Sequence, residues 1–190
     1  MKPILLGAMA FALLMTNGCT PRAVTIETYT NDGVEFSHQS DWPVNKDAHL
    51  DNAPNVRSIR VDGPDHAIVC LICIPPTSGQ TIDEFAASVA NDRIKEVDKR
   101  LSVGSLNLAD TTKGTSESTT ANVSGHPLTG IEQHFTITLL GMEVPHEAKF
   151  FCIEGGKYKI MIMTQAAESH VDSSKDGFDV ILNSLKIDGE

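Results

Sequence analysis

The chain has 190 residues, which is enough for one domain with a proper hydrophobic core and no need of a disulfide scaffold. Its 15 basic and 25 acidic residues give a formal net charge of −10, so the molecule repels phosphate backbones and nucleic acid is not expected as a partner. With 41% hydrophobic and 21% charged residues, the composition is that of a globular protein and excludes wholesale disorder.

Residues 1–18 form an apolar leader in which Lys2 is the one charged residue. The uninterrupted apolar run from Ile4 to Met15 is too short to cross a bilayer of about 30 Å as a helix. It has the length of a signal-peptide core. We therefore expect residues 1–18 to be an export signal.

Cys19 follows the leader in "MTNGCT", which resembles the lipobox of bacterial lipoproteins. Gly18 fits that pattern directly before the cysteine, whereas Thr16 stands where the pattern has a leucine-like residue. The resemblance implies cleavage before Cys19 and its acylation with chains such as palmitate, and two or more buried chains suffice for stable anchoring. The alternative is a plain signal peptide that leaves Cys19 as a free thiol. On the first interpretation residues 19–23 are a short lipid-anchored tether and residues 24–190 are a single domain held close to the membrane.

The residue after the cysteine bears on location. Thr20 is not the aspartate that lipoprotein sorting in enterobacteria reads as a signal for the inner membrane. The resemblance therefore implies a lipid-anchored protein of the cell envelope with its domain in the periplasm, on the outer membrane in preference to the inner one.

The first half of residues 24–190 has strand character. Residues 24–30, "VTIETYT", alternate in polarity, "NDG" at Asn31–Gly33 predicts a hairpin turn into "VEFSH", and residues 56–61 predict another strand. Residues 66–74, "HAIVCLICI", are apolar at both alternate positions. Such a strand must be buried on both faces.

A helix is predicted next. Thr81 and Glu84 have the spacing of a capping box, and apolar residues then recur at helical spacing as far as Leu101. Residues 111–125, "TTKGTSESTTANVSG", have almost no large apolar side chains. This segment is either a solvated loop or an edge hairpin.

Two strands and a closing helix complete the chain. Residues 147–166 predict a hairpin with a turn at Gly155–Gly156, which places Phe151 opposite Ile160, and both faces of this hairpin are apolar. Residues 173–185 have helical apolar spacing. Hairpins require antiparallel pairing, and strands that are apolar on both sides require cover on both sides. The sequence therefore predicts an α+β fold with a single antiparallel sheet and helices on both faces.

Cys70 and Cys73 have the C-x-x-C spacing of redox motifs. Redox chemistry needs the first cysteine at a helix N-terminus, where its pKa is lowered, but this pair lies within a predicted strand and points to opposite faces. We expect buried inert thiols. The main alternative is a disulfide from Cys152 to either Cys70 or Cys73, which requires a Cα separation below about 7 Å.

No catalytic, cofactor or metal-binding pattern stands out. The chain has seven histidines without an H-x-H or H-x-x-x-H pair, so surface histidines are expected and no metal ligand set is predicted. There is no G-x-S-x-G, and the nearest serine context, Ser124 to His126, lacks an identified acidic partner.

Four segments, "VEFSHQSDW", "TIDEFA", "EGGKYKI" and "FDVILNSLKI", together resemble the PsbP-like and DcrB-like proteins, which share an α/β/α sandwich with the Mog proteins. Members of this group are accessory or binding proteins, and no shared catalytic residue comes with the fold. The resemblance implies a non-enzymatic envelope lipoprotein that binds a protein partner. A small-molecule or metal-binding periplasmic module is the alternative, followed by an unrecognised hydrolase.

Overall fold

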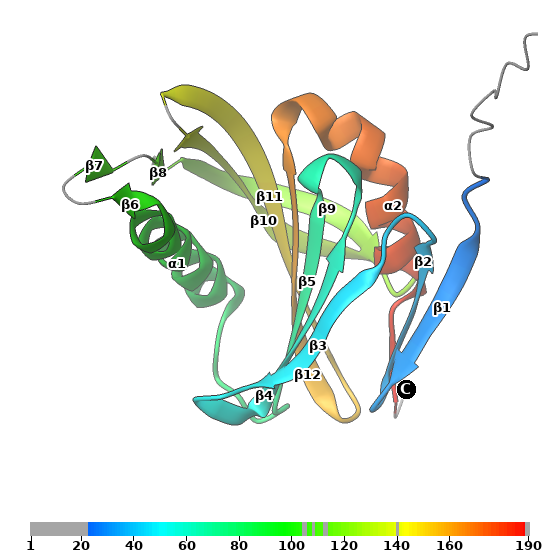
Figure 1. The fold of residues 1–190 in the computed structure, drawn as a ribbon. Coiled ribbons are helices and arrows are strands. Elements are labelled where there is room, and N and C mark those ends of the chain that lie inside the picture. The colour runs from blue at the N-terminus through cyan, green and yellow to red at the C-terminus, as the bar shows by residue number, and fades with distance from the viewer. Residues whose placement is uncertain (1–22, 104–105, 108, 112–113, 140, 189–190) are drawn as a thin grey trace, which may run out of the picture.

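The computed structural model describes residues 23–103, 106–107, 109–111, 114–139 and 141–188. These residues form a large antiparallel sheet, two smaller sheets and two α-helices (Figure 1). The large sheet has eight strands, in the spatial order β3 (Val44–Leu50), β4 (Ala53–Asp62), β5 (Ile68–Ile74), β12 (Tyr158–Ala167), β11 (Met142–Gly155), β10 (His126–Leu139) and β8 (Ala109–Thr111), with β9 (Thr115–Val123) also paired to β10.

The small elements lie around this sheet. A three-stranded sheet has the order β1 (Ile26–Asn31), β2 (Val34–Gln39) and β13 (Lys186–Ile187), and a two-stranded sheet joins β6 (Ser102–Val103) to β7 (Leu106–Asn107). The α-helices are α1 (Ile82–Leu101) and α2 (Val171–Ser184), and the 3₁₀ turns are η1 (Pro64–His66) and η2 (Glu168–His170).

The expected single sheet with helices on both faces was wrong. The described residues form three sheets, and one face of the large sheet is covered jointly by α2 and the sheet of β1, β2 and β13, while α1 lies against the other face (Figure 1). The hairpin over β1 and β2 was predicted correctly. Its alternating pattern predicts an apolar side but not the sheet to which the hairpin belongs. In the structure the hairpin is part of a separate small sheet, and its apolar side packs against the large sheet.

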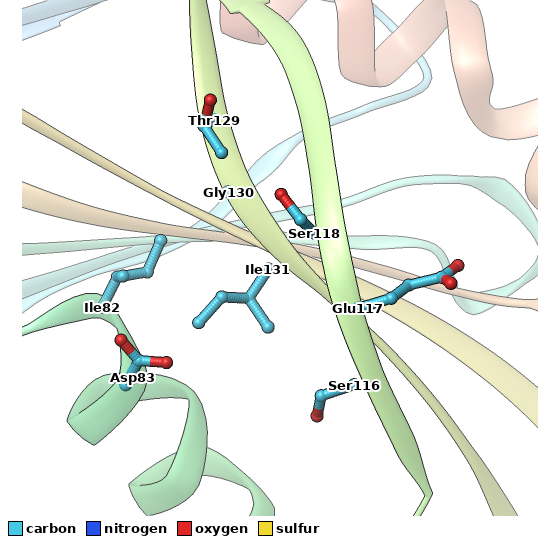
Figure 2. A pocket seen from close by; sticks show the side chains of 8 residues that line it. All are labelled: Ile82, Asp83, Ser116, Glu117, Ser118, Thr129, Gly130 and Ile131. Atoms are coloured by element: carbon cyan, nitrogen blue, oxygen red, sulfur yellow. The ribbon is translucent and has the colours of Figure 1, made fainter.

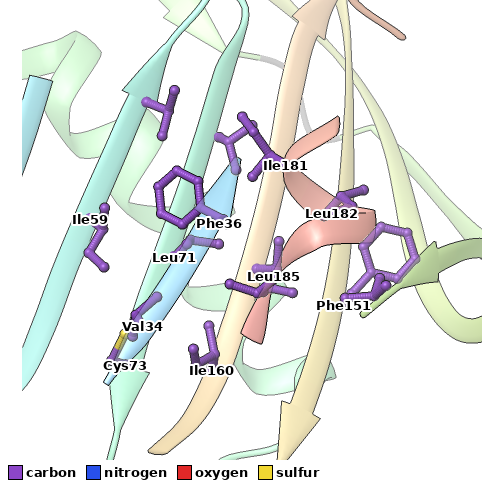
Figure 3. Close-up of a cluster of buried hydrophobic side chains, with 14 of the residues drawn as sticks. Val34, Phe36, Ile59, Leu71, Cys73, Phe151, Ile160, Ile181, Leu182 and Leu185 are labelled. Carbon is purple, nitrogen blue, oxygen red and sulfur yellow. The ribbon is translucent and has the colours of Figure 1, made fainter. Parts of the chain in front are cut away.

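The main core lies between the large sheet, β2 and α2 (Figure 3). Phe36 of β2, Leu71 of β5 and Ile181 of α2 have no exposed surface. Trp42 completes this core and contacts the edge of Phe178, with ring centroids 5.2 Å apart. A second, smaller core lies under α1, where the Phe85 ring meets Phe150 edge-on at 5.8 Å. Strands β5, β11 and β12 therefore bury both faces, as their sequences predicted.

The register of the β11–β12 hairpin differs from the prediction. Gly155 pairs with Tyr158, so the turn is Gly156–Lys157, and Phe151 lies opposite Ile162 instead of Ile160. The turn lies one residue later than predicted and the pairing is shifted by two residues, and a shift by an even number keeps every side chain on its predicted face. The capping box of α1 was predicted correctly, because Glu84 N–H donates to Thr81 Oγ1 at 3.2 Å and Thr81 N–H donates to Glu84 Oε2 at 2.9 Å.

Candidate functional site

Strand β9 is the outermost strand at one edge of the large sheet, where it pairs with β10 over nine consecutive positions without a bulge. Its sequence, "TSESTTANV", falls within the segment expected to be a loop or an edge hairpin, and the structure has the hairpin. Most of its side chains are exposed, and among the described residues β10 is its one strand partner. We call this outer border of Thr115–Val123 the β9 edge.

The β9 edge lacks the features that protect edge strands from pairing with other chains. Natural edges are blunted by lysine, proline, bulges or short length. The opposite edge, β3, has Lys46 and two irregularities in its register with β4. The β9 edge has nine residues in continuous register, and Glu117 is its one charged side chain. Of the two edges of the large sheet, the β9 edge is better suited to accept a further strand.

A shallow hollow of about 400 Å³ adjoins the β9 edge on the face that carries α1. Figure 2 shows Ile82 and Asp83 at the start of α1 on one side, with Ser116 and Ser118 of β9 opposite them. Ile131 of β10 lies between, and its apolar side chain points into the hollow (Figure 2). The hollow has room for a side chain of an extended segment lying along β9.

The other face of the same two strands carries charged side chains. Figure 2 shows Glu117 pointing away from Ile82 and Ile131, toward that second face. Glu117 lies opposite Glu132 of β10, which in turn lies opposite Lys149 of β11. We call this group the His134 cluster; its members are Glu117, Glu132, His134, Glu147, Lys149 and Glu168.

The imidazole of His134 is at the centre of this cluster. Its Nδ1 is 3.1 Å from Glu168 Oε1, and its Nε2 is 3.2 Å from Glu132 Oε1 and 3.8 Å from Glu117 Oε1. The hydrogen bond to Glu168 and the surrounding negative charge raise the pKa of His134 above its usual value of 6.5. Lys149 Nζ lies 2.9 Å from Glu147 Oε1 and 3.5 Å from Glu132 Oε2.

Cys70 and Cys73 lie on opposite faces of β5, as expected, and both thiols are free in the structure, as is that of Cys152. Cys152 lies on β11, and β12 separates that strand from β5. Two strand spacings amount to roughly 9.6 Å, beyond the reach of a disulfide. The structure therefore does not bring Cys152 to either proposed partner.

Burial disfavours the thiolate form of these three cysteines. It raises the pKa of Cys73 to about 12 and also raises the pKa of Cys70 and of Cys152. The thiolate is the reactive species in thiol chemistry, so the C-x-x-C spacing has no redox environment here.

The remaining residues singled out from the sequence play no shared chemical role in the described structure. Ser124 Oγ donates a hydrogen bond to Leu185 O at 2.7 Å, which ties the β9–β10 turn to the end of α2, and His126 is exposed. Cys19 and the leader lie outside the described residues.

Sequence reasoning missed the His134 cluster. Glu132 and His134 are two residues apart on one strand, so their side chains lie on the same face of the sheet. That spacing was the signal of the cluster that the sequence contained. The pairing of β9 with β10 supplies Glu117, and no spacing in the sequence encodes that register.

Within the described part of the chain, no helix is both long enough and apolar enough to span a membrane.

No protein-family model matches the chain, and no curated protein matches it. Among solved structures, it is similar to cyanobacterial PsbP (CyanoP) from Synechocystis sp. PCC 6803, with 16% identity and a TM-score of 0.46 over 96% of this chain and 98% of that one. It is similar to LpqN, which is involved in cell envelope biogenesis of Mycobacterium tuberculosis, with 14% identity and a TM-score of 0.38 over 87% and 92% of the two chains. A Pseudomonas aeruginosa protein of unknown function, PA94, has 12% identity and a TM-score of 0.31 over 80% and 90%.

Proposed function

We propose that this chain is a non-enzymatic, lipid-anchored accessory protein of the cell envelope, and that it binds a polypeptide partner by adding a strand of that partner to the β9 edge. The observation that carries the proposal is the unprotected β9 edge, nine residues long and in continuous register with β10. Strand addition obtains its affinity from main-chain hydrogen bonds and its specificity from pockets for alternate side chains.

The hollow beside the β9 edge provides such a pocket. Side chains of an added strand alternate between the two faces of the sheet, so every second residue of the partner would lie on the α1 face beside Ser116 and Ser118. Ile131 and Ile82 offer apolar contact there.

The anchor rests on the leader and Cys19, which precede the described residues. Val24 and Ile26, the first large apolar residues after the tether, are 53% and 59% exposed. Exposed apolar side chains directly after a lipid anchor would face the membrane surface, and they support an orientation with β1 toward the bilayer.

The test combines chemical crosslinking in intact cells with mass spectrometry, and it compares two lysine substitutions. Thr120→Lys places a charge at the β9 edge in the way natural edges are protected, whereas His49→Lys introduces a lysine at an exposed position of β3. We expect the first to remove the crosslinked partner and the second to retain it. If both variants retain the same partner, or if lipid alone is recovered from the wild type, the proposal fails.

A further inference from the structure

Three side chains that can each supply a metal-ligand atom, Glu117, Glu132 and His134, converge in the His134 cluster. The register places Glu117 opposite Glu132, and His134 follows two residues further on the same face. One ligand atom from each of these residues lies within 4.8 Å of both others. They come from two neighbouring strands of one sheet, so the backbone fixes their relative positions.

Glu168 determines which nitrogen of His134 faces the two carboxylates. A carboxylate accepts hydrogen bonds, so Nδ1 at 3.1 Å from Glu168 Oε1 carries the proton that it donates. In the neutral ring Nε2 then has a lone pair, and it faces Glu132 Oε1 and Glu117 Oε1. These three lone pairs repel one another unless a cation lies among them, either a metal ion or a second proton on the ring.

The spacing of these atoms suits a metal ion. Bonds of about 2.0–2.1 Å in a tetrahedral zinc site place neighbouring ligand atoms about 3.3 Å apart. The separation of His134 Nε2 from Glu132 Oε1 is 3.2 Å, and that from Glu117 Oε1 is 3.8 Å. Glu117 is 68% exposed and has the freedom to approach by the remaining half ångström. A carboxylate on the second ring nitrogen of a ligating histidine is also the usual outer-shell partner in zinc sites.

The surrounding charges favour a divalent cation. The other carboxylates that act on His134 are those of Glu147 and Glu168, and Lys149 pairs with Glu147. Lys149 holds Glu147 and the second oxygen of Glu132, which leaves Glu132 Oε1 directed at the imidazole. One ammonium does not balance the four carboxylates of the cluster, and a divalent ion would offset most of the excess negative charge.

We propose that the His134 cluster binds a divalent transition-metal ion of the zinc class. Nε2 of His134 and one oxygen each of Glu132 and Glu117 supply the protein ligands, and water completes the coordination. Glu168 orients the imidazole from the other side. The inference goes beyond partner binding at the β9 edge, since it depends on the opposite face of β9 and β10. The alternative to a metal ion at this position is a second proton on the His134 ring.

The test titrates Zn²⁺ into the full-length protein, purified in mild detergent, by isothermal calorimetry at neutral pH. We expect one ion per chain, a loss of affinity of more than tenfold in His134→Ala and Glu132→Gln, and a loss of about 10–100-fold in Glu168→Gln. His126→Ala is the matched control, because His126 is an exposed histidine of the same strand, and it should bind Zn²⁺ as the wild type does.

A second measurement distinguishes a metal ion bound to Nε2 of His134 from a second proton on the ring. With saturating Zn²⁺, nitrogen NMR should show that the His134 ring no longer titrates, with Nδ1 protonated and Nε2 bound to metal. The proposal is overturned if Zn²⁺ does not bind, if His134→Ala binds it as tightly as the wild type, or if the ring still takes up a second proton at saturation. If the variants at the partly buried residues fail to fold, Glu117→Gln, at an exposed position, provides the test by the same calorimetric measurement. We expect it to lower the Zn²⁺ affinity at least threefold.

Discussion

The guanidinium of Arg57 binds the carboxylate of Asp47 through two hydrogen bonds, from Nε at 2.6 Å and from Nη2 at 2.8 Å. Arg57 lies on β4 and has only 2% of its side chain exposed. Its remaining donors reach the Asn31 carbonyl at 3.1 Å and the Tyr29 hydroxyl at 2.9 Å, both on β1. The buried guanidinium of Arg57 therefore connects the sheet of β1, β2 and β13 to the large sheet.

Loss of Arg57 should strongly destabilise the protein. Arg57→Met leaves the Asp47 carboxylate with hydrogen bonds from Tyr29 and Asn31 but without its cationic partner, and breaking a buried pair on one side costs about 3–5 kcal/mol. The control is Arg60→Met, because Arg60 is 48% exposed and pairs with Asp62, so its loss should cost about 0–1 kcal/mol. Urea unfolding measures both changes, and similar small losses in the two variants would refute this connecting role of Arg57.

The same pair predicts a loss of stability in acid. Hydrogen bonds from Arg57 hold the pKa of Asp47 well below its usual value of 3.8. A depressed folded-state pKa gives stability that is present above the unfolded-state value and is lost as the pH falls toward the folded-state value. The difference in unfolding free energy between wild type and Asp47→Asn should therefore shrink steadily below about pH 4. A difference that stays constant down to about pH 2 would contradict this assignment.

Gly177 should not tolerate a methyl group, although it lies within α2. An added Cβ would come within 2.1 Å of the Trp42 ring. Alanine favours the helix by about 1 kcal/mol over glycine, but overpacking a core costs about 1–3 kcal/mol, so we expect Gly177→Ala to lower the melting temperature. Gly79→Ala, with no atom within 4 Å of the new Cβ, should leave it nearly unchanged. An increase in melting temperature for Gly177→Ala would show that Trp42 adapts.

Lipidation at Cys19 is tested separately from the fold. We expect radiolabelled palmitate to enter the wild type and not Cys19→Ala, which should also move from the membrane to the soluble fraction. The control is Cys152→Ala, because that thiol is on β11 and belongs to the folded domain. Equal labelling of wild type and Cys19→Ala would rule out the anchor.

Local features were the ones that sequence could predict. The capping box of Thr81 and Glu84, the two-faced strand of Cys70 and Cys73, and the face assignment of residues 150–163 depend on neighbours within a few positions. The sheet to which β1 and β2 belong depends instead on contacts such as Arg57 with Tyr29, between distant strands.

The candidate site could be predicted only in part, for the same physical reason. The β9 edge is exposed and polar, so its apolar pattern is too weak to distinguish a strand from a loop. Glu117 meets His134 through the pairing of β9 with β10, and that register follows from the turn at Ser124–Gly125, where both residues have a positive φ. Such a turn is recognised readily only once the strands beside it are known.

Site-specific photo-crosslinking in intact cells tests the central claim most directly. A benzoylphenylalanine at Ser118, exposed on the β9 edge beside the hollow, is compared with the same residue at His49, an exposed position of β3. Partner binding at the β9 edge predicts one protein adduct of defined mass from Ser118 and none from His49. Absence of a protein adduct at Ser118, or the same adduct from both positions, would contradict it.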